Sequence, residues 1–127
     1  MATVLVVDDD EDVRFLLGSV LRRTGFAVLE AVTGIDALAQ LAATETMPDL
    51  IVLDVQMPDL DGWETLESLR LDIRTRTVPV MLCTVRAAEA DIERAWSLGC
   101  DDVVTKPFAI AELVERATRL IESRSRG

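Results

Sequence analysis

The sequence predicts one α/β domain with a three-layer, doubly wound (βα)5 fold, in which helices cover both faces of a five-stranded parallel sheet of order 2-1-3-4-5. Its 127 residues are enough for one domain, and half of them are hydrophobic, which excludes a disordered chain. Short apolar runs alternate five times with segments of helical spacing, which implies right-handed crossovers between parallel strands. We expect the domain to cover residues 1–122, followed by a polar tail or the start of a linker at 123–127.

Five runs rich in Val, Ile or Leu are the predicted strands. They lack a clean polar alternation, which is typical of strands buried on both faces of a sheet. The runs cover Thr3–Val7, Ala27–Glu30, Leu50–Leu53, Pro79–Cys83 and Asp102–Thr105. They are therefore predicted to form the buried middle layer.

The first two helices are predicted from their apolar spacing and their end signals. The first has acidic residues at its start and Arg22 and Arg23 before Gly25, as expected for a helix start and stop. Its predicted core face consists of Val13, Leu16, Leu17, Val20 and Leu21. The second runs from Thr33, and its apolar face is expected at Ile35, Leu38 and Leu41.

The remaining three helices follow the same logic. The spacing of Asp61 and Glu64 fits a capping box at the start of the third, which is expected to bury Leu66 and Leu69. The fourth covers about 88–98 and stops at Gly99. The fifth carries an apolar stripe made of Ile110, Leu113, Val114, Ala117 and Leu120.

Composition excludes several functional classes. The net charge is −10, so the domain should repel phosphate backbones and anionic lipid, and we expect no direct binding of nucleic acid or membrane. The first residues lack a basic segment, and no apolar run reaches the roughly 18 to 20 residues of a membrane span, which favours a cytoplasmic protein. The absence of histidine removes the usual zinc ligand and excludes Ser/His or Cys/His catalysis. Cys83 and Cys100 are expected to be free thiols.

Polar side chains follow four of the predicted strands. Asp8, Asp9 and Asp54 would meet at the point where the winding of the sheet reverses, with Thr84 and Lys106 beside them. The second strand ends in Glu30 and contributes nothing comparable. Three crowded carboxylates would raise at least one of their pKa values unless a cation lay among them, and hard oxygen ligands favour Mg²⁺.

Four motifs together resemble the receiver domain of bacterial two-component response regulators. They are VVDDD at 6–10, LDVQMPDLDGWE at 53–64, a strand ending in Thr84, and DDVVTKPF at 101–108. The resemblance covers nearly the whole chain and implies a flavodoxin-like fold. It also implies a phosphoacceptor switch rather than an enzyme acting on an external substrate.

The resemblance assigns roles residue by residue. Asp54 would accept a phosphoryl group from a histidine kinase or phosphotransfer protein, an external donor because the chain has no histidine. Asp9, Asp54 and the backbone carbonyl of Gln56 would hold Mg²⁺, or Mn²⁺, with Asp8 acting mainly through water. Thr84 and Lys106 would contact the incoming phosphoryl group.

Further positions would modulate the reaction or shape its surroundings. Gln56 and Arg86 are expected at the mouth of the site, where they would set the rate of hydrolysis. Val85 is bulkier than the family's usual Ala or Gly, and Val103 stands where the family commonly has Tyr or Phe. Pro58 and Gly62 would shape the loop before the third helix, and the Lys106–Pro107 bond is expected to be cis.

The output surface is expected around the fourth helix, fifth strand and fifth helix. It would include Trp96, Val103, Glu112, Val114 and Arg116, with Trp96 partly exposed. The predicted helix at 88–98 has few basic residues, so it lacks the ladder of charges through which some family members form dimers. This favours an unidentified output protein or domain as the partner. It also favours a monomer or a weak phosphorylation-dependent dimer.

Two other functions remain open from the residues alone. The first is a degenerate receiver that serves as a protein-binding scaffold without phosphotransfer. The second is an aspartate-nucleophile phosphatase of the haloacid dehalogenase type, with Asp8 as nucleophile and Asp10 as acid/base. That phosphatase would leave Asp54 without a role.

Overall fold

The computed structural model describes residues 1–55, 62–85 and 89–126. Its five strands form one parallel sheet of order β2-β1-β3-β4-β5, which confirms the predicted fold. The strands are β1 (Thr3–Val7), β2 (Ala27–Ala31), β3 (Leu50–Asp54), β4 (Val80–Thr84) and β5 (Asp102–Thr105). The helices are α1 (Glu11–Thr24), α2 (Gly34–Ala43), α3 (Gly62–Leu71), α4 (Glu89–Ser97) and α5 (Ile110–Arg126).

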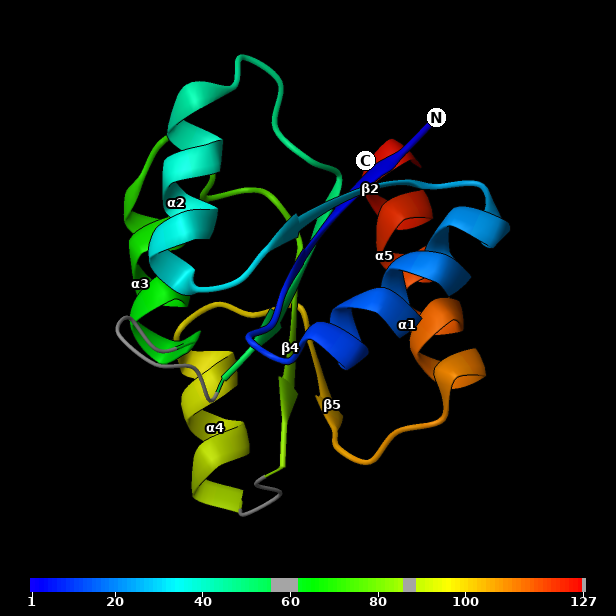
Figure 1. Cartoon of the computed structure of the whole chain (residues 1–127). Helices are drawn as coiled ribbons and strands as arrows, with labels where there is room; N and C mark the ends of the chain where they lie inside the picture. Colours follow the sequence, from blue (N-terminus) through cyan, green and yellow to red (C-terminus); the bar gives the residue numbers. More distant parts are fainter. Residues whose placement is uncertain (56–61, 86–88, 127) are drawn as a thin grey trace.

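The helices cover the sheet unequally, with α1 and α5 on one face and α2, α3 and α4 on the other (Figure 1). Successive strand side chains point to opposite faces, so each strand feeds both cores. In β1, Val4 and Val6 pack toward α1 and α5, whereas Leu5 and Val7 pack toward the other three helices. All four are essentially inaccessible to solvent, as expected for a parallel sheet covered on both sides.

Local signals start and stop α1 as predicted. Asp10 caps its start, because one carboxylate oxygen accepts from the backbone N–H groups of Asp12 and Val13. Gly25 ends it at φ 110°, in the left-handed region. The N–H groups of Gly25 and Phe26 then bond the last carbonyls of the helix.

Some sequence expectations were wrong in detail. Leu16 and Ile35, predicted on core faces, are 49% and 56% exposed. Leu16 lies about 100° around the helix from the buried Leu17, so the core stripe of α1 is narrower than the apolar pattern suggested. The polar segment expected from 123 is helical as far as Arg126, where α5 ends. The capping residue expected at Asp61 lies outside the described residues.

The edge strand β2 is partly covered by side chains. Gln40 of α2 donates from Nε2 to the carbonyl oxygen of Glu30, at 2.8 Å. The Glu30 carboxylate lies 3.6 Å from Nε of Arg14 and 3.4 Å from Nη2 of Arg22, both on α1.

Within the three described ranges, we find no helix with the length and apolar character needed to span a bilayer.

Candidate functional site

Three carboxylates gather at the carboxyl ends of two neighbouring strands. Asp8 and Asp9 follow β1, and Asp54 is the last residue of β3. One carboxylate oxygen from each lies within 4.8 Å of the others. Asp8 and Asp54 are 3% and 6% exposed, whereas Asp9 is exposed. Three oxygen donors of this kind would suit a hard divalent cation such as Mg²⁺.

Lys106 supplies the positive charge of the cluster. Its Nζ lies 3.0 Å from Oδ2 of Asp8 and 3.5 Å from Oδ1 of Asp54. Burial alone would lower the pKa of Lys106, but the hydrogen bond to Asp8 and the charges of Asp54 and Asp8 outweigh it and raise the pKa above 10.5. The lysine is therefore charged at neutral pH. Its bond to Pro107 is cis, as expected.

Thr84 lies beside the carboxylates at the end of β4 and is 3% exposed. Backbone hydrogen bonds connect the strand ends here. The N–H of Lys106 donates to the carbonyl of Thr84 at 2.7 Å, and the N–H of Val55 donates to that of Cys83 at 3.0 Å. Val85, the next residue along the chain, is 55% exposed. Gln56, Pro58 and Arg86 lie outside the described residues.

Gly62 brings the start of α3 against the end of β3. Its N–H donates to the carbonyl of Val55 at 2.9 Å. A Cβ at this position would lie 2.4 Å from the carbonyl oxygen of Asp54 and 2.5 Å from Cα of Val55. This approach is possible only for glycine, which gives a reason for the residue beyond loop shape.

The sequence did not predict the role of Arg14, which connects Glu30 of β2 to Asp8. Nη1 of Arg14 donates to the backbone carbonyl of Asp8 at 2.7 Å, and the same guanidinium faces the Glu30 carboxylate. Sequence spacing gives no signal for this contact because Asp8 follows β1, Arg14 lies in α1 and Glu30 lies in β2. The second strand therefore contributes to the surroundings of the site through Arg14.

The two cysteines are unsuited to chemistry at this site. Burial raises the pKa of the Cys83 thiol to about 12 and that of Cys100 to about 11, so both are protonated at neutral pH. Both are free and buried. They belong to the cores, as expected.

The predicted output residues lie around the edge strand β5. Trp96 on α4 is 51% exposed. Arg116 pairs with Asp102 at 3.2 Å and with Glu112 at 3.1 Å, and it donates to the carbonyl of Val103. Val103 and Val114 are half-buried and pack into the two separate cores. This region thus offers an exposed indole on α4 and paired charges on α5 and β5.

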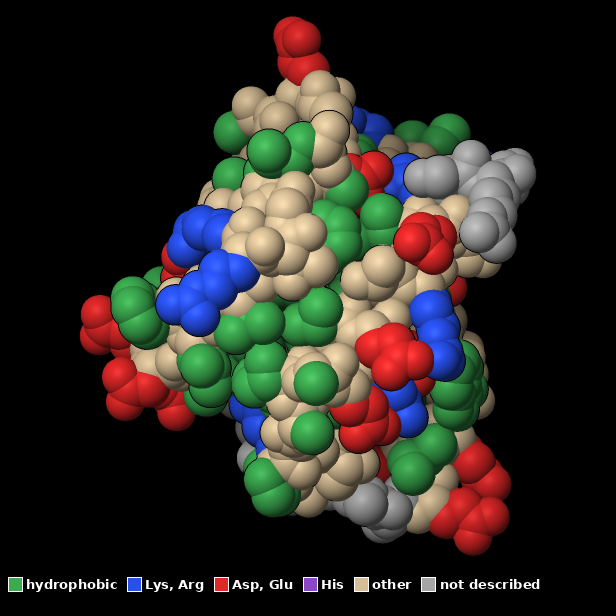
Figure 2. Space-filling model, turned by 90° about the vertical axis from the view of Figure 1, so that its right-hand side faces the viewer, with side chains coloured by type: hydrophobic (Ala, Val, Ile, Leu, Met, Phe, Trp, Pro, Cys, Tyr) green, Lys and Arg blue, Asp and Glu red, His purple; other side chains and the backbone are tan. Residues whose placement is uncertain are grey.

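Hydrophobic side chains also gather over α1 and α5 (Figure 2). Phe15 is 72% exposed and Leu16 is 49% exposed on α1. A groove of about 240 Å³ is lined by residues of α1, Leu16 among them, and by residues of the segment from Lys106 to Ile110. Lys106 therefore borders both the acidic cluster and an apolar surface.

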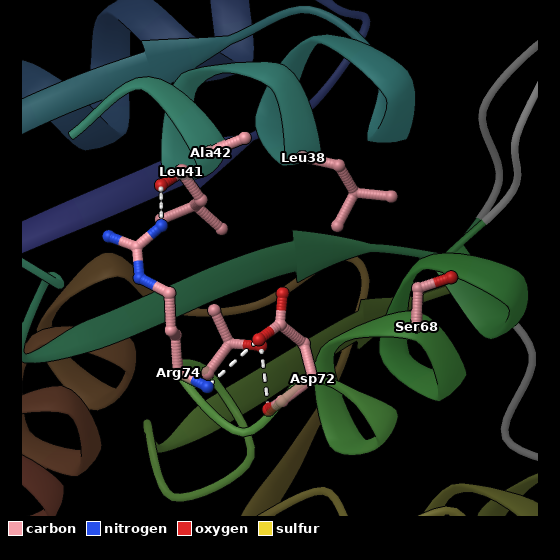
Figure 3. Close-up of a pocket in the computed structure, with 7 residues that line it drawn as sticks. Leu38, Leu41, Ala42, Ser68, Asp72 and Arg74 are labelled. Atoms are coloured by element: carbon pink, nitrogen blue, oxygen red, sulfur yellow. Dashed lines mark hydrogen bonds between the residues drawn. The ribbon is translucent and has the colours of Figure 1, made fainter.

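A second cavity lies away from the acidic cluster. It measures about 190 Å³ and separates α2 from the end of α3 and the loop that follows (Figure 3). Arg74 crosses it and donates from Nη1 to the carbonyl of Leu41, and a second bond from Nη2 reaches the carbonyl of Thr44. The guanidinium thus satisfies carbonyls at the carboxyl end of α2.

Comparison with known proteins fits this arrangement. The family model for the response regulator receiver domain matches residues 4–118. The chain belongs to this family. The receiver domain is 45% identical over 121 residues to the transcriptional regulatory protein PrrA of Mycobacterium tuberculosis, which covers 95% of this chain and 50% of that relative. It is 39% identical over 113 residues to the phosphate regulon regulator PhoB of Escherichia coli, covering 89% and 48%.

Solved structures agree with the receiver fold. The receiver domain of a signal transduction histidine kinase from Syntrophus aciditrophicus matches with a TM-score of 0.91 at 31% identity, covering 100% of this chain and 95% of that one. The BeF3-activated DrrB receiver domain matches with a TM-score of 0.85 at 30% identity, covering 96% and 98%. The receiver spans about half the length of the curated relatives PrrA and PhoB.

Proposed function

We propose that this receiver domain is a phosphoacceptor switch, in which Asp54 takes a phosphoryl group from a histidine kinase or phosphotransfer protein. The observation that carries the proposal is the buried Asp54 carboxylate beside the Lys106 ammonium and the acidic pair Asp8 and Asp9. The domain catalyses its own modification and slow hydrolysis, but it does not turn over an external substrate. Its location would be cytoplasmic, where kinases of this class act.

The residues divide the work of phosphoryl transfer. One oxygen of Asp54 attacks phosphorus as the bond from phosphorus to the donor nitrogen breaks, and that electron pair stays on the donor imidazole. Lys106, held 3.5 Å from Asp54, offers its charge to the phosphoryl oxygens. Thr84 offers a hydroxyl from the neighbouring strand end. A carboxylate attacks directly, so Asp54 needs no general base.

A divalent cation fits the carboxylate donors. Asp9, Asp54 and the backbone carbonyl of Gln56 would bind Mg²⁺ or Mn²⁺ directly, and Asp8 would act mainly through a water. When bound, the ion supplies positive charge that offsets the negative charge of the phosphoryl oxygens. The protein's part is to hold the carboxylates together despite their mutual repulsion.

The two surfaces beside the site have different roles in this proposal. The donor would dock on the apolar groove over α1 and the Lys106–Ile110 segment, because Lys106 lines that groove and also contacts Asp8 and Asp54. The output would be read at Trp96 and the charges of Glu112 and Arg116, where an exposed indole is a suitable anchor for a partner. Val103 lacks the aromatic ring of the usual family switch, so the signal would pass through other side chains.

The test is uptake of phosphoryl from acetyl phosphate, followed by intact-protein mass and acid-labile phosphate. Wild-type protein should gain one phosphoryl group with Mg²⁺ and none with a chelator. Asp54→Asn should gain none, whereas Asp12→Asn, which changes an exposed carboxylate of α1, should behave as wild type. Uptake by Asp54→Asn at the wild-type level would refute the assignment.

The two alternatives have less support. Asp10, the acid/base of the phosphatase hypothesis, uses its carboxylate to cap α1. The scaffold hypothesis leaves the Lys106 contacts to Asp8 and Asp54 without a purpose. Turnover of a small phosphate ester would favour the phosphatase, and a wild-type protein that takes up no phosphoryl would favour the scaffold.

A further inference from the structure

Asp8 is held at every polar atom. Its N–H donates to the carbonyl of Ala31 at 3.2 Å, and its Oδ1 accepts from the N–H of Asp10 at 2.9 Å. Oδ2 accepts from Lys106, and the backbone carbonyl accepts from Arg14 at 2.7 Å. The contact to Ala31 continues the sheet, the contact to Asp10 closes the turn, and the contact to Lys106 belongs to the acidic site. Arg14, which makes the remaining contact, has no role in the proposed function.

Arg14 is built into the fold rather than laid on the surface. Its side chain is 14% exposed, and Nε faces Oε1 of Glu30 at 3.6 Å while Nη1 reaches Asp8. The planar guanidinium can make both contacts at once, which an ammonium group cannot reproduce. Glu30 thus anchors the arginine from β2, and the arginine anchors the turn that carries Asp8 and Asp9.

We propose that Arg14 is a positioning residue for the divalent-cation site, where it fixes the backbone at Asp8 and so the separation of the carboxylates. The inference rests on the proposed function insofar as those carboxylates bind the cation. Glu30 acts one step further away, by orienting the guanidinium.

The direction in which cation affinity changes when Arg14 is replaced distinguishes a positioning role from an effect of its charge alone. A guanidinium near a cation site repels the cation, so a residue acting through its charge alone would strengthen binding when removed. A positioning residue has the opposite effect, because its loss lets the carboxylates move apart. Residues behind metal ligands commonly change affinity by about 10-fold or more when replaced.

The experiment measures Mn²⁺ binding by the loss of the free-ion electron paramagnetic resonance signal, without any phosphoryl donor. Arg14→Lys keeps the charge but loses the double contact, and Arg14→Met removes the charge as well. Arg22→Lys is the matched control, because Arg22 also pairs with Glu30 and is 51% exposed on the same helix. Urea unfolding of the metal-free proteins shows that each variant is folded.

We expect both Arg14 variants to raise the Mn²⁺ dissociation constant about 10-fold, with Arg22→Lys within about twofold of wild type. Unchanged binding in folded Arg14→Lys and Arg14→Met would overturn the inference, and so would tighter binding in Arg14→Met. An equal loss in Arg22→Lys would also overturn it, because the effect would then pass through Glu30 without the contact to Asp8. Should Arg14→Met unfold, Glu30→Gln replaces it, and unchanged binding in both Glu30→Gln and Arg14→Lys would overturn the inference.

Failure of the proposed function is seen in wild type, before any variant is compared. A wild-type domain that binds Mn²⁺ but takes up no phosphoryl group refutes the acceptor role and leaves the positioning test in force. A wild-type domain that binds no Mn²⁺ refutes the cation site itself and the role of Arg14 with it.

Discussion

Gly62 packs closer to the backbone of Asp54 than any larger residue could. Its Cα faces the carbonyl of Asp54 so directly that a Cβ would lie 2.4 Å from that oxygen. The clash is with backbone atoms, which cannot rotate away as a side chain can. A methyl group here would therefore displace either the end of β3 or the start of α3.

We predict that Gly62→Ala lowers the free energy of unfolding by about 2 kcal/mol and slows phosphoryl uptake, because relief of the clash moves Asp54. Gly25→Ala is the control. Gly25 has φ 110° but open space around its Cα, so alanine there should cost about 1 kcal/mol of backbone strain and leave uptake unchanged. Urea unfolding and acetyl phosphate labelling measure the two effects. Normal uptake in Gly62→Ala would show that the contact does not position Asp54.

Among the helices, α2 has an unusual end. It has no basic residue in its last turn, and Thr44 follows it in extended backbone rather than a left-handed cap. Arg74, from the loop after α3, supplies the missing donors across the cavity shown in Figure 3. The interaction also places a positive charge at the negative end of the helix dipole.

Arg74→Gln should therefore lower the free energy of unfolding by about 1 kcal/mol, a modest value because the residue is exposed. The loss should appear as faster hydrogen exchange in the last turn of α2. Arg76→Gln changes an exposed arginine of the same loop and should stay within about 0.5 kcal/mol of wild type. Equal effects of the two changes would mean that the general charge of the loop matters and the contact to α2 does not.

The net charge of −10 affects the stability of the domain as well as its choice of partners. Three of the carboxylates are crowded together, so a cation that binds only the folded domain should stabilise it. At about 100 times its dissociation constant, Mg²⁺ should add roughly 2.7 kcal/mol. We predict a corresponding rise in the melting temperature that is lost in Asp9→Asn. A rise of the same size in that variant would remove Asp9 from the ligand set.

The apolar surface over α1 leads to a prediction about phosphoryl transfer from the kinase. Phe15→Ser should slow phosphoryl transfer from a phosphorylated kinase by about 10-fold, because an exposed aromatic anchor is lost, and leave uptake from acetyl phosphate unchanged. Leu71→Ser is the control, since Leu71 is 81% exposed at the end of α3. Equal transfer to both variants would place donor docking elsewhere.

The sequence was most informative for the strands and for the polar residues that follow them. Runs rich in Val, Ile or Leu predicted the sheet. Polar residues at the ends of β1 and β3 led to Asp8, Asp9 and Asp54, because parallel strands bring their carboxyl ends together. Helix faces were less certain. Leu16 and Ile35 are apolar at helical spacing, yet the width of the buried stripe depends on how each helix lies on the sheet.

Contacts between side chains far apart in the sequence could not be predicted, for a different reason. In the sequence Glu30 is only the end of a strand, and nothing in its spacing to Arg14 indicates that one guanidinium connects it to Asp8. Such a contact depends on the relative placement of three elements. Local pattern carries no information on it.

The covered edge of β2 also affects how the domain behaves at high concentration. An open edge strand is a template on which a strand from another molecule can add and begin a growing aggregate. Here Gln40 already occupies the Glu30 carbonyl, and two arginines flank the charged side chain. An incoming strand would have to displace that side-chain bond and bury three charges. The contacts that hold Arg14 in place therefore also protect the sheet from templated growth.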